Sequence, residues 1–263
     1  MIGRRPLDSR LLCGALGVAG LFCAMEAAGR TGLISPVVFP LASTVLGRAA
    51  ELATEGDFLA DVVSTIGAWA AGLLLTVVIA VPLGFALGTL PRVERAFRPI
   101  LEFLRPIPSV ALIPLALVLF SDKTDMKVML IVYAASWPVL INTMYGLKDV
   151  DPLAKETLRS FGFGPLAVLW RVSLPSTAPF IATGVRLAAS IALIVAISAE
   201  LLAGGASGIG TFVIEAGGSA DALEYIIAAA IWAGILGFVV NALLVLVERR
   251  IFRWHTARTG TAR

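Results

Sequence analysis

The sequence predicts an all-α integral membrane protein with six membrane-spanning helices, and three observations support this fold class. Of the 263 residues, 58% are hydrophobic and 15% are charged, and the mean hydropathy is +0.91. Soluble globular proteins are about 45–50% apolar and about 25% charged. Six stretches are apolar over roughly the 20 residues that a bilayer core requires. The basic residues gather on one side of these stretches, as is typical of membrane topology.

The six stretches define one transmembrane domain over residues 1–263. They cover residues 11–28, 62–90, 100–120, 126–147, 177–203 and 223–247. Each is apolar on every face and rich in Ala, Gly and Leu, which is typical of closely packed membrane helices. None shows the alternation over about 10 residues that marks a strand of a membrane β-barrel.

The first stretch follows three arginines, so a cleaved signal peptide is the alternative to a membrane span. Cleavage would leave five spans and no explanation for the distribution of basic residues, and we therefore expect a span. Cys13 and Cys23 lie in this stretch, about 15 Å apart at ~1.5 Å per residue of helix. A disulfide requires Cα atoms within about 7 Å, so these cysteines cannot pair within one chain.

Two outer segments connect the stretches. The first, residues 30–61, is long, and its 36–52 part could form an interfacial helix. The second, residues 204–221, is rich in Gly and Ser. Neither has the composition of a linker between domains.

The third stretch contains Pro106, Pro108 and Pro114. Proline interrupts the helical hydrogen bonds, so kinks are expected here, and kinks create concave space. Glu102 and Arg105 lie three residues apart in the same stretch. A local ion pair on one helix face is therefore expected between them.

With the N-terminus in the cytoplasm, fifteen of the 21 basic residues fall on the cytoplasmic side and four on the outer side. The fifteen are Arg4, Arg5, Arg10, Arg92, Arg95, Arg98, Lys148, Lys155, Arg159, Arg171, Arg249, Arg250, Arg253, Arg258 and Arg263. The outer four are Arg30, Arg48, Lys123 and Lys127. Cytoplasmic loops carry an excess of Lys and Arg, so both ends of the chain are expected in the cytoplasm.

Few residues are available for catalysis or metal binding. The single histidine, His255, lies in the basic tail, so a zinc site would need several carboxylates. No HExxH, GxSxG or GxxxxGK[ST] motif occurs. We therefore expect no enzymatic activity, no metal and no ATP site in this chain. A net charge of only +3, spread by topology, argues against nucleic-acid binding.

The segment between the fourth and fifth stretches, residues 148–176, is too polar to span a membrane. Asp151 is a good helix N-cap, and Pro152 suits the first helical position. Apolar or half-apolar residues then recur at helical spacing. They are Leu153, Thr157, Leu158 and Phe161. A short amphipathic helix is therefore expected.

Two glycines, Gly162 and Gly164, are expected to end this helix. A second short helix, residues 165–172, is expected to stop before Leu174 and Pro175. The segment is thus predicted to be two short helices with a glycine corner.

This segment resembles the EAA loop of ABC importer permeases. Glu156 and Gly162 match that pattern, and after nine further residues Val172-Ser-Leu174-Pro175 matches its end. Two residues, Thr157 and Leu158, replace its alanines. The resemblance implies a type I ABC importer permease in which the loop is a coupling helix that contacts an ATPase subunit. The expected docking residues are Glu156, Thr157, Leu158, Gly162, Leu174 and Pro175.

Further runs resemble the taurine, alkanesulfonate, nitrate and bicarbonate branch of these permeases. They are RPIPSVALIPLALVLF at 105–120, SWPVLINTMYGLKDVDP at 136–152, LPSTAPFIATGVRLAASIALIVAISAELL at 174–202 and GGASGIG at 204–210. The chain departs from the branch in two places. Residues 121–125 replace a Phe-Gly-x-Gly turn, and Ser190 and Leu193 replace the usual Gly and Trp. Substrate identity therefore should not be transferred from any one member.

Five residues in these runs are candidates for the transport pathway: Ser109, Trp137, Asn142, Arg186 and Glu200. By residue count Arg186 lies near mid-membrane, where a charge costs about 2.5–3.5 kcal/mol or more and normally faces a cavity or a partner. It would orient an anion in the pathway or form a structural pair within the bundle. Glu200, near the outer edge, would gate the pathway or contact a binding protein, or it would cap or pack a helix.

The resemblance also implies partners and a location. We expect a second copy of the permease, two ATPase subunits that bind ATP and Mg, and an extracytoplasmic substrate-binding protein, at a bacterial inner membrane. No cofactor is expected in this chain. The substrate is expected to be a small anion such as a sulfonate, nitrate, bicarbonate or carboxylate, and a neutral or cationic vitamin precursor is the alternative.

Two further classes remain as alternatives. A secondary transporter driven by an ion gradient often shows an inverted repeat, and none is found in this sequence. A membrane-embedded enzyme would need a cluster of catalytic residues, which the sequence does not offer. ATPase activity that appears only with an added partner would separate the importer from both.

Overall fold

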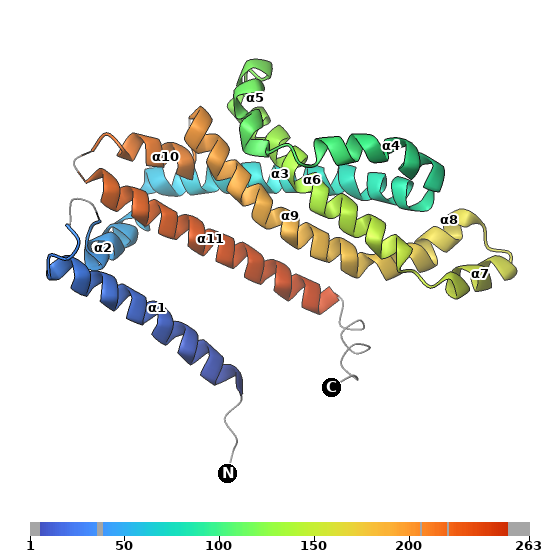
Figure 1. Cartoon of the computed structure of the whole chain (residues 1–263), viewed down its shortest axis with the longest axis horizontal. Coiled ribbons are helices and arrows are strands. Elements are labelled where there is room, and N and C mark those ends of the chain that lie inside the picture. Colours follow the sequence, from blue (N-terminus) through green and yellow to red (C-terminus); the bar gives the residue numbers. More distant parts are fainter. Residues whose placement is uncertain (1–5, 36–38, 206, 220, 252–263) are drawn as a thin grey trace, which may run out of the picture. The chain divides into compact units, whose positions relative to one another are not determined.

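The computed structural model describes residues 6–35, 39–205, 207–219 and 221–251, and every regular element within them is helical (Figure 1). In chain order they are α1 (Pro6–Arg30), α2 (Ala42–Leu52), α3 (Gly56–Thr89), α4 (Pro91–Leu104), η1 (Ser109–Leu112), α5 (Ile113–Leu119), α6 (Lys123–Lys148), α7 (Pro152–Ser160), α8 (Pro165–Val168), η2 (Leu169–Ser173), α9 (Leu174–Ala203), α10 (Ile209–Ala216) and α11 (Ala222–Ile251). The expectations for Arg4, Arg5, Arg253, His255, Arg258 and Arg263 fall outside the described residues.

Five helical segments are long and apolar enough to cross a membrane. They are Leu12–Arg30, Gly56–Thr89, Lys123–Lys148, Pro165–Ala203 and Ala222–Ile251. A sixth crossing exists if the bent pair Pro91–Leu104 and Ser109–Leu119 counts as one span. The observed segments correspond to the six expected stretches. Cys13 and Cys23 are free cysteines, as expected from their spacing.

The third stretch differs from the expected helix over 100–120. Helix α4 starts earlier, at Pro91, and ends at Leu104, and the following arm turns by 80°. Pro106 and Pro108 lie in the break. Proline has no N–H to donate, and it also disfavours a helical conformation in the residue before it. Two prolines in three positions therefore break the helix instead of only kinking it.

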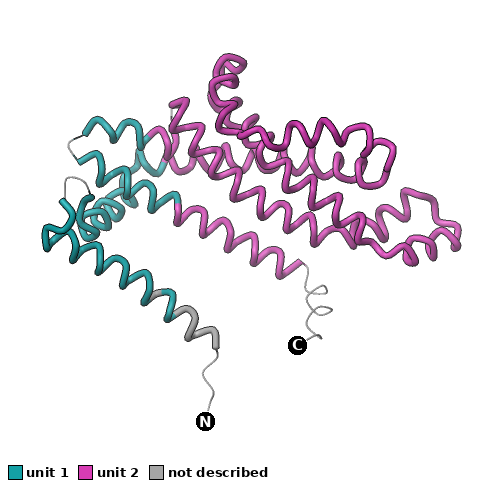
Figure 2. Tube along the Cα trace, viewed as in Figure 1, with its two compact units in different colours: residues 1–59, 212–233 teal, residues 60–211, 234–263 magenta. Residues whose placement is uncertain are grey.

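The contacts divide the chain into two compact units, which Figure 2 colours separately. Unit 1 comprises residues 1–59 and 212–233, and unit 2 comprises residues 60–211 and 234–263. Each unit is described here by itself.

In unit 1, hydrogen bonds and ion pairs join α1, α2 and the start of α11. The Glu26 carboxylate on α1 accepts hydrogen bonds from the backbone N–H (3.0 Å) and the hydroxyl (2.9 Å) of Ser43 in the first turn of α2. Arg48 is paired with three carboxylates, those of Glu51 at 2.9 Å, Asp221 at 2.7 Å and Glu224 at 3.1 Å. The helix expected over 36–52 is observed as α2, its interfacial position stays a prediction, and residues 36–38 lie outside the described part.

In unit 2, α6 and α9 pack closely against each other. The buried residues of this pair include Ile131, Ala135, Val139, Ala188, Ala192 and Ala196. A Cβ added at Gly184 on α9 would lie 2.9 Å from the carbonyl oxygen of Pro138 on α6, so glycine permits the close crossing. Small residues commonly allow membrane helices to approach in this way. The pair forms the frame on which the charged sites of unit 2 are built.

Candidate functional site

The segment between α6 and α9 has the helix start and stop that its sequence predicts. The Asp151 carboxylate accepts a hydrogen bond from the N–H of Leu153 at 2.8 Å, which caps α7. Gly162 has a φ of 80°, a conformation that favours glycine. The N–H of Phe163 reaches back to the carbonyl of Leu158 at 3.1 Å, which closes the C-terminus of α7. The short helix expected at the start of this segment is therefore confirmed as α7, and its coupling role stays a prediction.

The remainder of the segment differs from expectation. Gly164 does not end α7 but precedes α8 as its N-cap residue. The second short helix does not stop before Leu174, because α8 continues through the π-helical turn η2 into α9. Pro175 lies in the first turn of α9, where a missing N–H is tolerated. Residues 165–203 thus form one helical run.

Helix α7 and the turn after it present apolar side chains that nothing in the described chain covers. No residue of α7 is buried. Four large side chains are more than three-fifths exposed: Leu153 (68%), Phe161 (77%), Leu166 (71%) and Trp170 (66%). Among the expected docking residues, Glu156 and Thr157 are exposed and Leu158 is half-buried. Large apolar side chains exposed along α7, α8 and η2 indicate an interaction surface.

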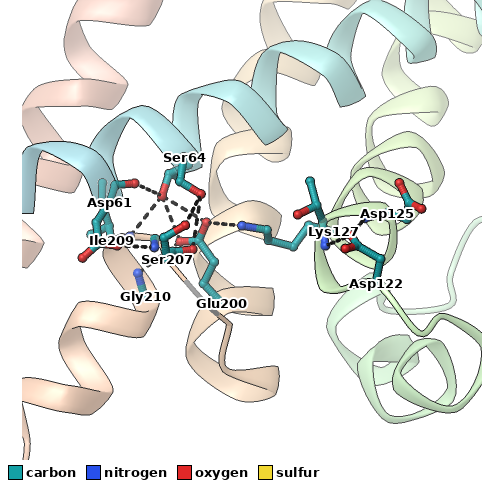
Figure 3. A network of polar contacts seen from close by, with 12 residues as sticks. Asp61, Ser64, Asp122, Asp125, Lys127, Glu200, Ser207, Ile209 and Gly210 are labelled. Atoms are coloured by element: carbon teal, nitrogen blue, oxygen red, sulfur yellow. Dashed lines mark hydrogen bonds and ion pairs between the residues drawn. The ribbon is translucent and has the colours of Figure 1, made fainter. Parts of the chain in front are cut away.

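The carboxylate of Glu200 lies at the centre of a buried polar cluster near the end of α9 (Figure 3). Glu200 is fully buried, and Lys127 from α6 is 4% exposed, with its Nζ 3.0 Å from Glu200 Oε1. The hydroxyl of Thr65 on α3 lies 3.0 Å from each carboxylate oxygen. The N–H of Gly210 donates to Oε2 at 3.1 Å. The carboxylate is therefore both paired with a cation and hydrogen-bonded.

Residues 207–210 are fixed to α3 through the same cluster. The N–H of Ile209 donates to the Thr65 hydroxyl at 3.0 Å, and the N–H of Gly208 donates to Asp61 at 2.6 Å. The Ser207 hydroxyl donates to that of Ser64 at 2.9 Å. The expected glycine-rich turn is thus a tightly held connection.

A side chain would not fit at the centre of that turn. A Cβ at Gly208 would lie 2.3 Å from Glu200 Cδ, and a Cβ at Gly210 would lie 2.5 Å from the carbonyl oxygen of Ile197. Both glycines therefore allow the backbone to approach the carboxylate closely. The geometry matches the cap-and-packing alternative for Glu200, and its gating role stays a prediction.

Two lysines counted as outer-loop charges have specific partners instead. Lys127 is buried against Glu200, and Lys123 donates to the carbonyl of Ala203 at the C-terminus of α9, at 3.1 Å. Beside them, Asp122 caps α6 by accepting from the N–H groups of Asp125 (3.0 Å) and Thr124 (2.7 Å). These two hydrogen bonds hold the pKa of Asp122 below its ordinary value. The residues that replace the expected Phe-Gly-x-Gly turn therefore form a helix start.

Three other pathway candidates have contacts of their own. Arg186 on α9 lies 3.4 Å from the carboxylate of Glu248 on α11, and both side chains are partly exposed. The Asn142 side chain donates to the carbonyl of Pro138, one turn earlier in α6, at 2.8 Å. Ser109 begins the 3₁₀ turn η1. The structure does not bring these residues into one site, and their roles in a pathway stay predictions.

The fifth candidate, Trp137, lines a pocket of about 390 Å³ between α4 and α6. One end of the pocket is fixed by the ion pair of Lys148 with Glu94, at 2.8 Å. Near the other end the Tyr133 hydroxyl donates to the carbonyl of Leu104, the last residue of α4, at 2.7 Å. The rings of Tyr133 and Trp137 pack edge to face, 6.0 Å apart. The two contacts between α4 and α6 thus fix their separation at the pocket, and the aromatic pair lies within α6.

The expected pair of Glu102 with Arg105 does not form. Glu102 instead accepts from Arg98, four residues earlier on α4, at 2.9 Å. Arg105 caps the C-terminus of α4 with a helical backbone, its N–H donating to the carbonyl of Leu101 at 3.0 Å, so the pair fails because Arg98 already holds the Glu102 carboxylate. Its side chain lines the pocket with Trp137.

Sequence reasoning missed Thr65, Lys127 and Tyr133 as site residues. A signal existed for Lys127, because a lysine and a glutamate that both fall inside apolar stretches are each costly unless they meet. For Arg186, spacing along its own helix offers no acidic partner, because Glu248 lies on another helix. Thr65 and Tyr133 carried no such signal.

Comparisons with known proteins agree with the arrangement of helices. A family model described as "Binding-protein-dependent transport system inner membrane component" matches residues 80–253. A nitrate import permease protein of Leptolyngbya laminosa is 29% identical over 75% of this chain and 70% of the relative. The taurine transport system permease protein of Escherichia coli (strain K12) is 28% identical over 96% of this chain and 93% of the relative.

The fold is also that of a solved transporter. A bacterial alginate ABC transporter, solved in complex with an alginate pentasaccharide-bound periplasmic protein, aligns with a TM-score of 0.61 at 17% identity, over 95% of this chain and 98% of that one. The matched family model covers the end of α3 and all of the bent pair, α6, the coupling segment, α9 and α11. The chain therefore belongs to the family of binding-protein-dependent transport system inner membrane components, and it is a membrane-spanning permease subunit of an ABC importer.

Proposed function

We propose that this permease imports a small anion, and that its energy comes from ATP bound with Mg by two partner ATPase subunits. Two observations support the anion: relatives named for nitrate and taurine import, and Arg186, which residue count places near mid-membrane inside an apolar run. The chain itself would hold no cofactor. A neutral or cationic substrate is the alternative for the same permease.

The observation that carries the proposal is the exposed apolar surface of α7 and the residues after it. Such a surface needs a partner, and its place between two membrane spans suits an ATPase subunit that docks there. The helical run over 165–203 then connects the docking segment to a membrane span without a loop. Closure of the ATPase pair would move α7, and the run would carry that movement into the membrane.

The assembly would contain two copies of this permease. Closed two-fold dimers are the commonest oligomers, and a pathway between two copies would let each contribute the same residues. An extracytoplasmic binding protein would deliver the anion at the outer side. The distribution of basic residues supports cytoplasmic termini in a bacterial inner membrane.

Docking is tested by changing α7 without changing the spans. In Glu156→Lys and Gly162→Val variants, co-purification with the ATPase subunits and ATP-driven uptake should both fall at least tenfold. Gly162→Asn is the matched control for the turn, because asparagine tolerates a positive φ and should retain more function than valine. Glu55→Lys reverses an exposed charge outside the segment and should leave both measurements unchanged. Normal assembly and uptake in Glu156→Lys and Gly162→Val together would refute docking at α7.

A further inference from the structure

We propose that a pocket between the end of α3 and the segment α7–α8 binds the headgroup of an anionic phospholipid, and that Lys155 and Arg159 hold its phosphate. The pocket has a volume of about 590 Å³ and lies where the end of α3 meets α7 and α8 (Figure 1). The inference goes beyond the proposed function, because it concerns the lipid around the permease and not the solute that the permease transports.

The two faces of α7 differ in what they meet. Lys155 and Arg159 are four residues apart, so they are neighbours on one face of the helix, and both line the pocket. Leu153, Glu156 and Thr157 are exposed and are not part of its lining. The two cations therefore lie on the side of α7 that faces α3. The proposed docking residues lie on the other side, so a lipid and an ATPase subunit can be bound at once.

The pocket carries two positive charges that no acidic group compensates. Its lining within the described chain includes no Asp or Glu. The Lys155 ammonium donates one long hydrogen bond, to the carbonyl of Leu147 at 3.4 Å, and it has three donors. Among the described residues, no carboxylate forms an ion pair with Lys155 or Arg159. Arg159 is exposed, so an incoming phosphate has access to it.

The pocket lies at the depth where lipid headgroups are expected. Thr89, the last residue of α3, and Leu147, next to the last residue of α6, both line it. Both helices are long and apolar enough to cross a membrane, so their ends lie near the headgroup layer. The distribution of basic residues supports the cytoplasmic leaflet for this end. Basic pockets between membrane helices on that side bind anionic headgroups in other proteins.

The apolar part of the lining favours a lipid over a free phosphate. Phe85, Leu90 and Leu169 supply apolar surface beside the two cations, and Leu90 is 51% exposed. A free phosphate would contact the cations alone, whereas a phospholipid would also cover this surface. Acyl chains already confine a lipid to the bilayer, so its headgroup loses less freedom on binding.

The two cations select a headgroup with a net negative charge. The Arg159 guanidinium is a planar fork that suits two phosphate oxygens, and the Lys155 ammonium adds a point charge. A zwitterionic headgroup such as that of phosphatidylcholine brings its own cation, which the pocket would repel. Each basic residue near an anionic surface contributes about fivefold in affinity, so the two together account for roughly 25-fold.

The site can be tested by native mass spectrometry of the delipidated full-length chain in detergent. The probes are phosphatidylglycerol, which is anionic, and phosphatidylcholine with the same acyl chains. The first phosphatidylglycerol should bind with an apparent Kd at least tenfold below that of the first phosphatidylcholine. Glycerophosphoglycerol, the same headgroup without acyl chains, distinguishes a lipid site from a free-phosphate site. At a hundredfold excess it should displace less than half of the bound phosphatidylglycerol.

Three double variants connect the affinity to the pocket. Lys155→Gln/Arg159→Gln should weaken binding of phosphatidylglycerol at least tenfold and that of phosphatidylcholine less than twofold. Arg92→Gln/Arg95→Gln removes two charges from exposed positions on α4, outside the pocket, and should change either Kd less than twofold. Lys155→Arg/Arg159→Lys keeps both charges and should stay within threefold of the wild type.

A phosphatidylglycerol with a photoreactive diazirine on its headgroup locates the site in the wild-type chain, and it decides the matter if the neutral double variant does not fold. Its crosslinks should fall on residues 85–90 or 155–169. Equal Kd values for the two lipids, an unchanged Kd in Lys155→Gln/Arg159→Gln, displacement by the soluble headgroup, or crosslinks confined to other segments would each overturn the proposal. The test involves neither uptake nor the ATPase subunits, so its failure would leave the proposed function intact.

Discussion

The polar cluster around Glu200 and the pocket between α4 and α6 both contain several charged residues, but they differ in how deeply those charges are buried. Glu200 receives hydrogen bonds from Lys127, Thr65 and Gly210. In the pocket, Arg105 is exposed, and the side chains of the Arg98–Glu102 pair are 69% and 67% exposed. The cluster joins three chain segments and leaves no capacity for a ligand. Water can solvate the charges of the pocket, so pairing there contributes little to stability, whereas the buried carboxylate of Glu200 requires its partners.

The largest expected effect comes from unpairing the cluster. Lys127→Met would leave a buried, uncompensated carboxylate, which typically costs about 3–5 kcal/mol in the free energy of unfolding. Denaturant titration of the purified permease in detergent measures the loss. The double variant Lys127→Met/Glu200→Gln should recover more than half of it, because the neutral amide needs no cation. A loss below about 1 kcal/mol in the single variant would show that the pair is not structural.

A smaller loss in the free energy of unfolding is expected when a side chain is added to the turn that follows α9. Gly208→Ala puts a Cβ against the Glu200 carboxylate and should destabilise the protein by about 1–3 kcal/mol. Gly67→Ala on α3 is the matched control, since nothing lies within 4 Å of its added Cβ and alanine favours a helix. The melting temperatures of the two variants should move in opposite directions. Equal behaviour would contradict the close fit of the turn.

Two tryptophans allow a direct comparison of an indole N–H that is hydrogen-bonded with one that has no partner in the described part of the chain. The Trp69 indole donates to the carbonyl of Ala189 at 2.9 Å, so Trp69→Phe should cost about 0.5–1.5 kcal/mol for the lost hydrogen bond. Trp137→Phe removes a donor without a partner and should be nearly neutral in the free energy of unfolding, measured without anion. An equal cost at both positions would mean that Trp137 already has a partner.

The smallest effect concerns the cap of α6. The pKa of Asp122 lies below its ordinary value of 3.8, so its contribution to stability is present above that pH and is lost as the pH falls through the lowered pKa. Asp122→Asn keeps the cap but does not titrate. Between pH 6 and pH 3 the melting temperature of the wild type should therefore fall more than that of the variant. Parallel curves would show that the charge of Asp122 does not stabilise the helix start.

The sequence predicted most elements because their signals are local. Apolar length identified the spans, and Asp151 with Pro152 and Gly162 defined both ends of α7. The signals failed at prolines, because a proline alone does not show whether the helix around it continues or breaks. Pro175 suggested a helix stop, but a π turn accommodates it, whereas Pro106 and Pro108 suggested only a kink and instead break the helix.

The sites were less predictable because their contacts join distant parts of the chain. Lys127 meets Glu200, and Arg186 meets Glu248, across different helices. Spacing along one helix cannot reveal such pairs. It also wrongly predicted an ion pair between Glu102 and Arg105, because Glu102 pairs with Arg98. Trp137 was a candidate from its motif alone, and only the structure showed its unused donor.

The length of α3 has a consequence for the surrounding lipid. Its 34 residues extend about 51 Å at ~1.5 Å per residue, well beyond a hydrocarbon core of about 30 Å. A helix with so much excess length must tilt or project, whereas the 11-residue arm Ser109–Leu119 is too short to cross by itself. Bilayer thickness therefore acts unequally on these two elements. Thicker membranes would bring α3 more upright, and they would bury more of the lipid-facing surface next to the short arm.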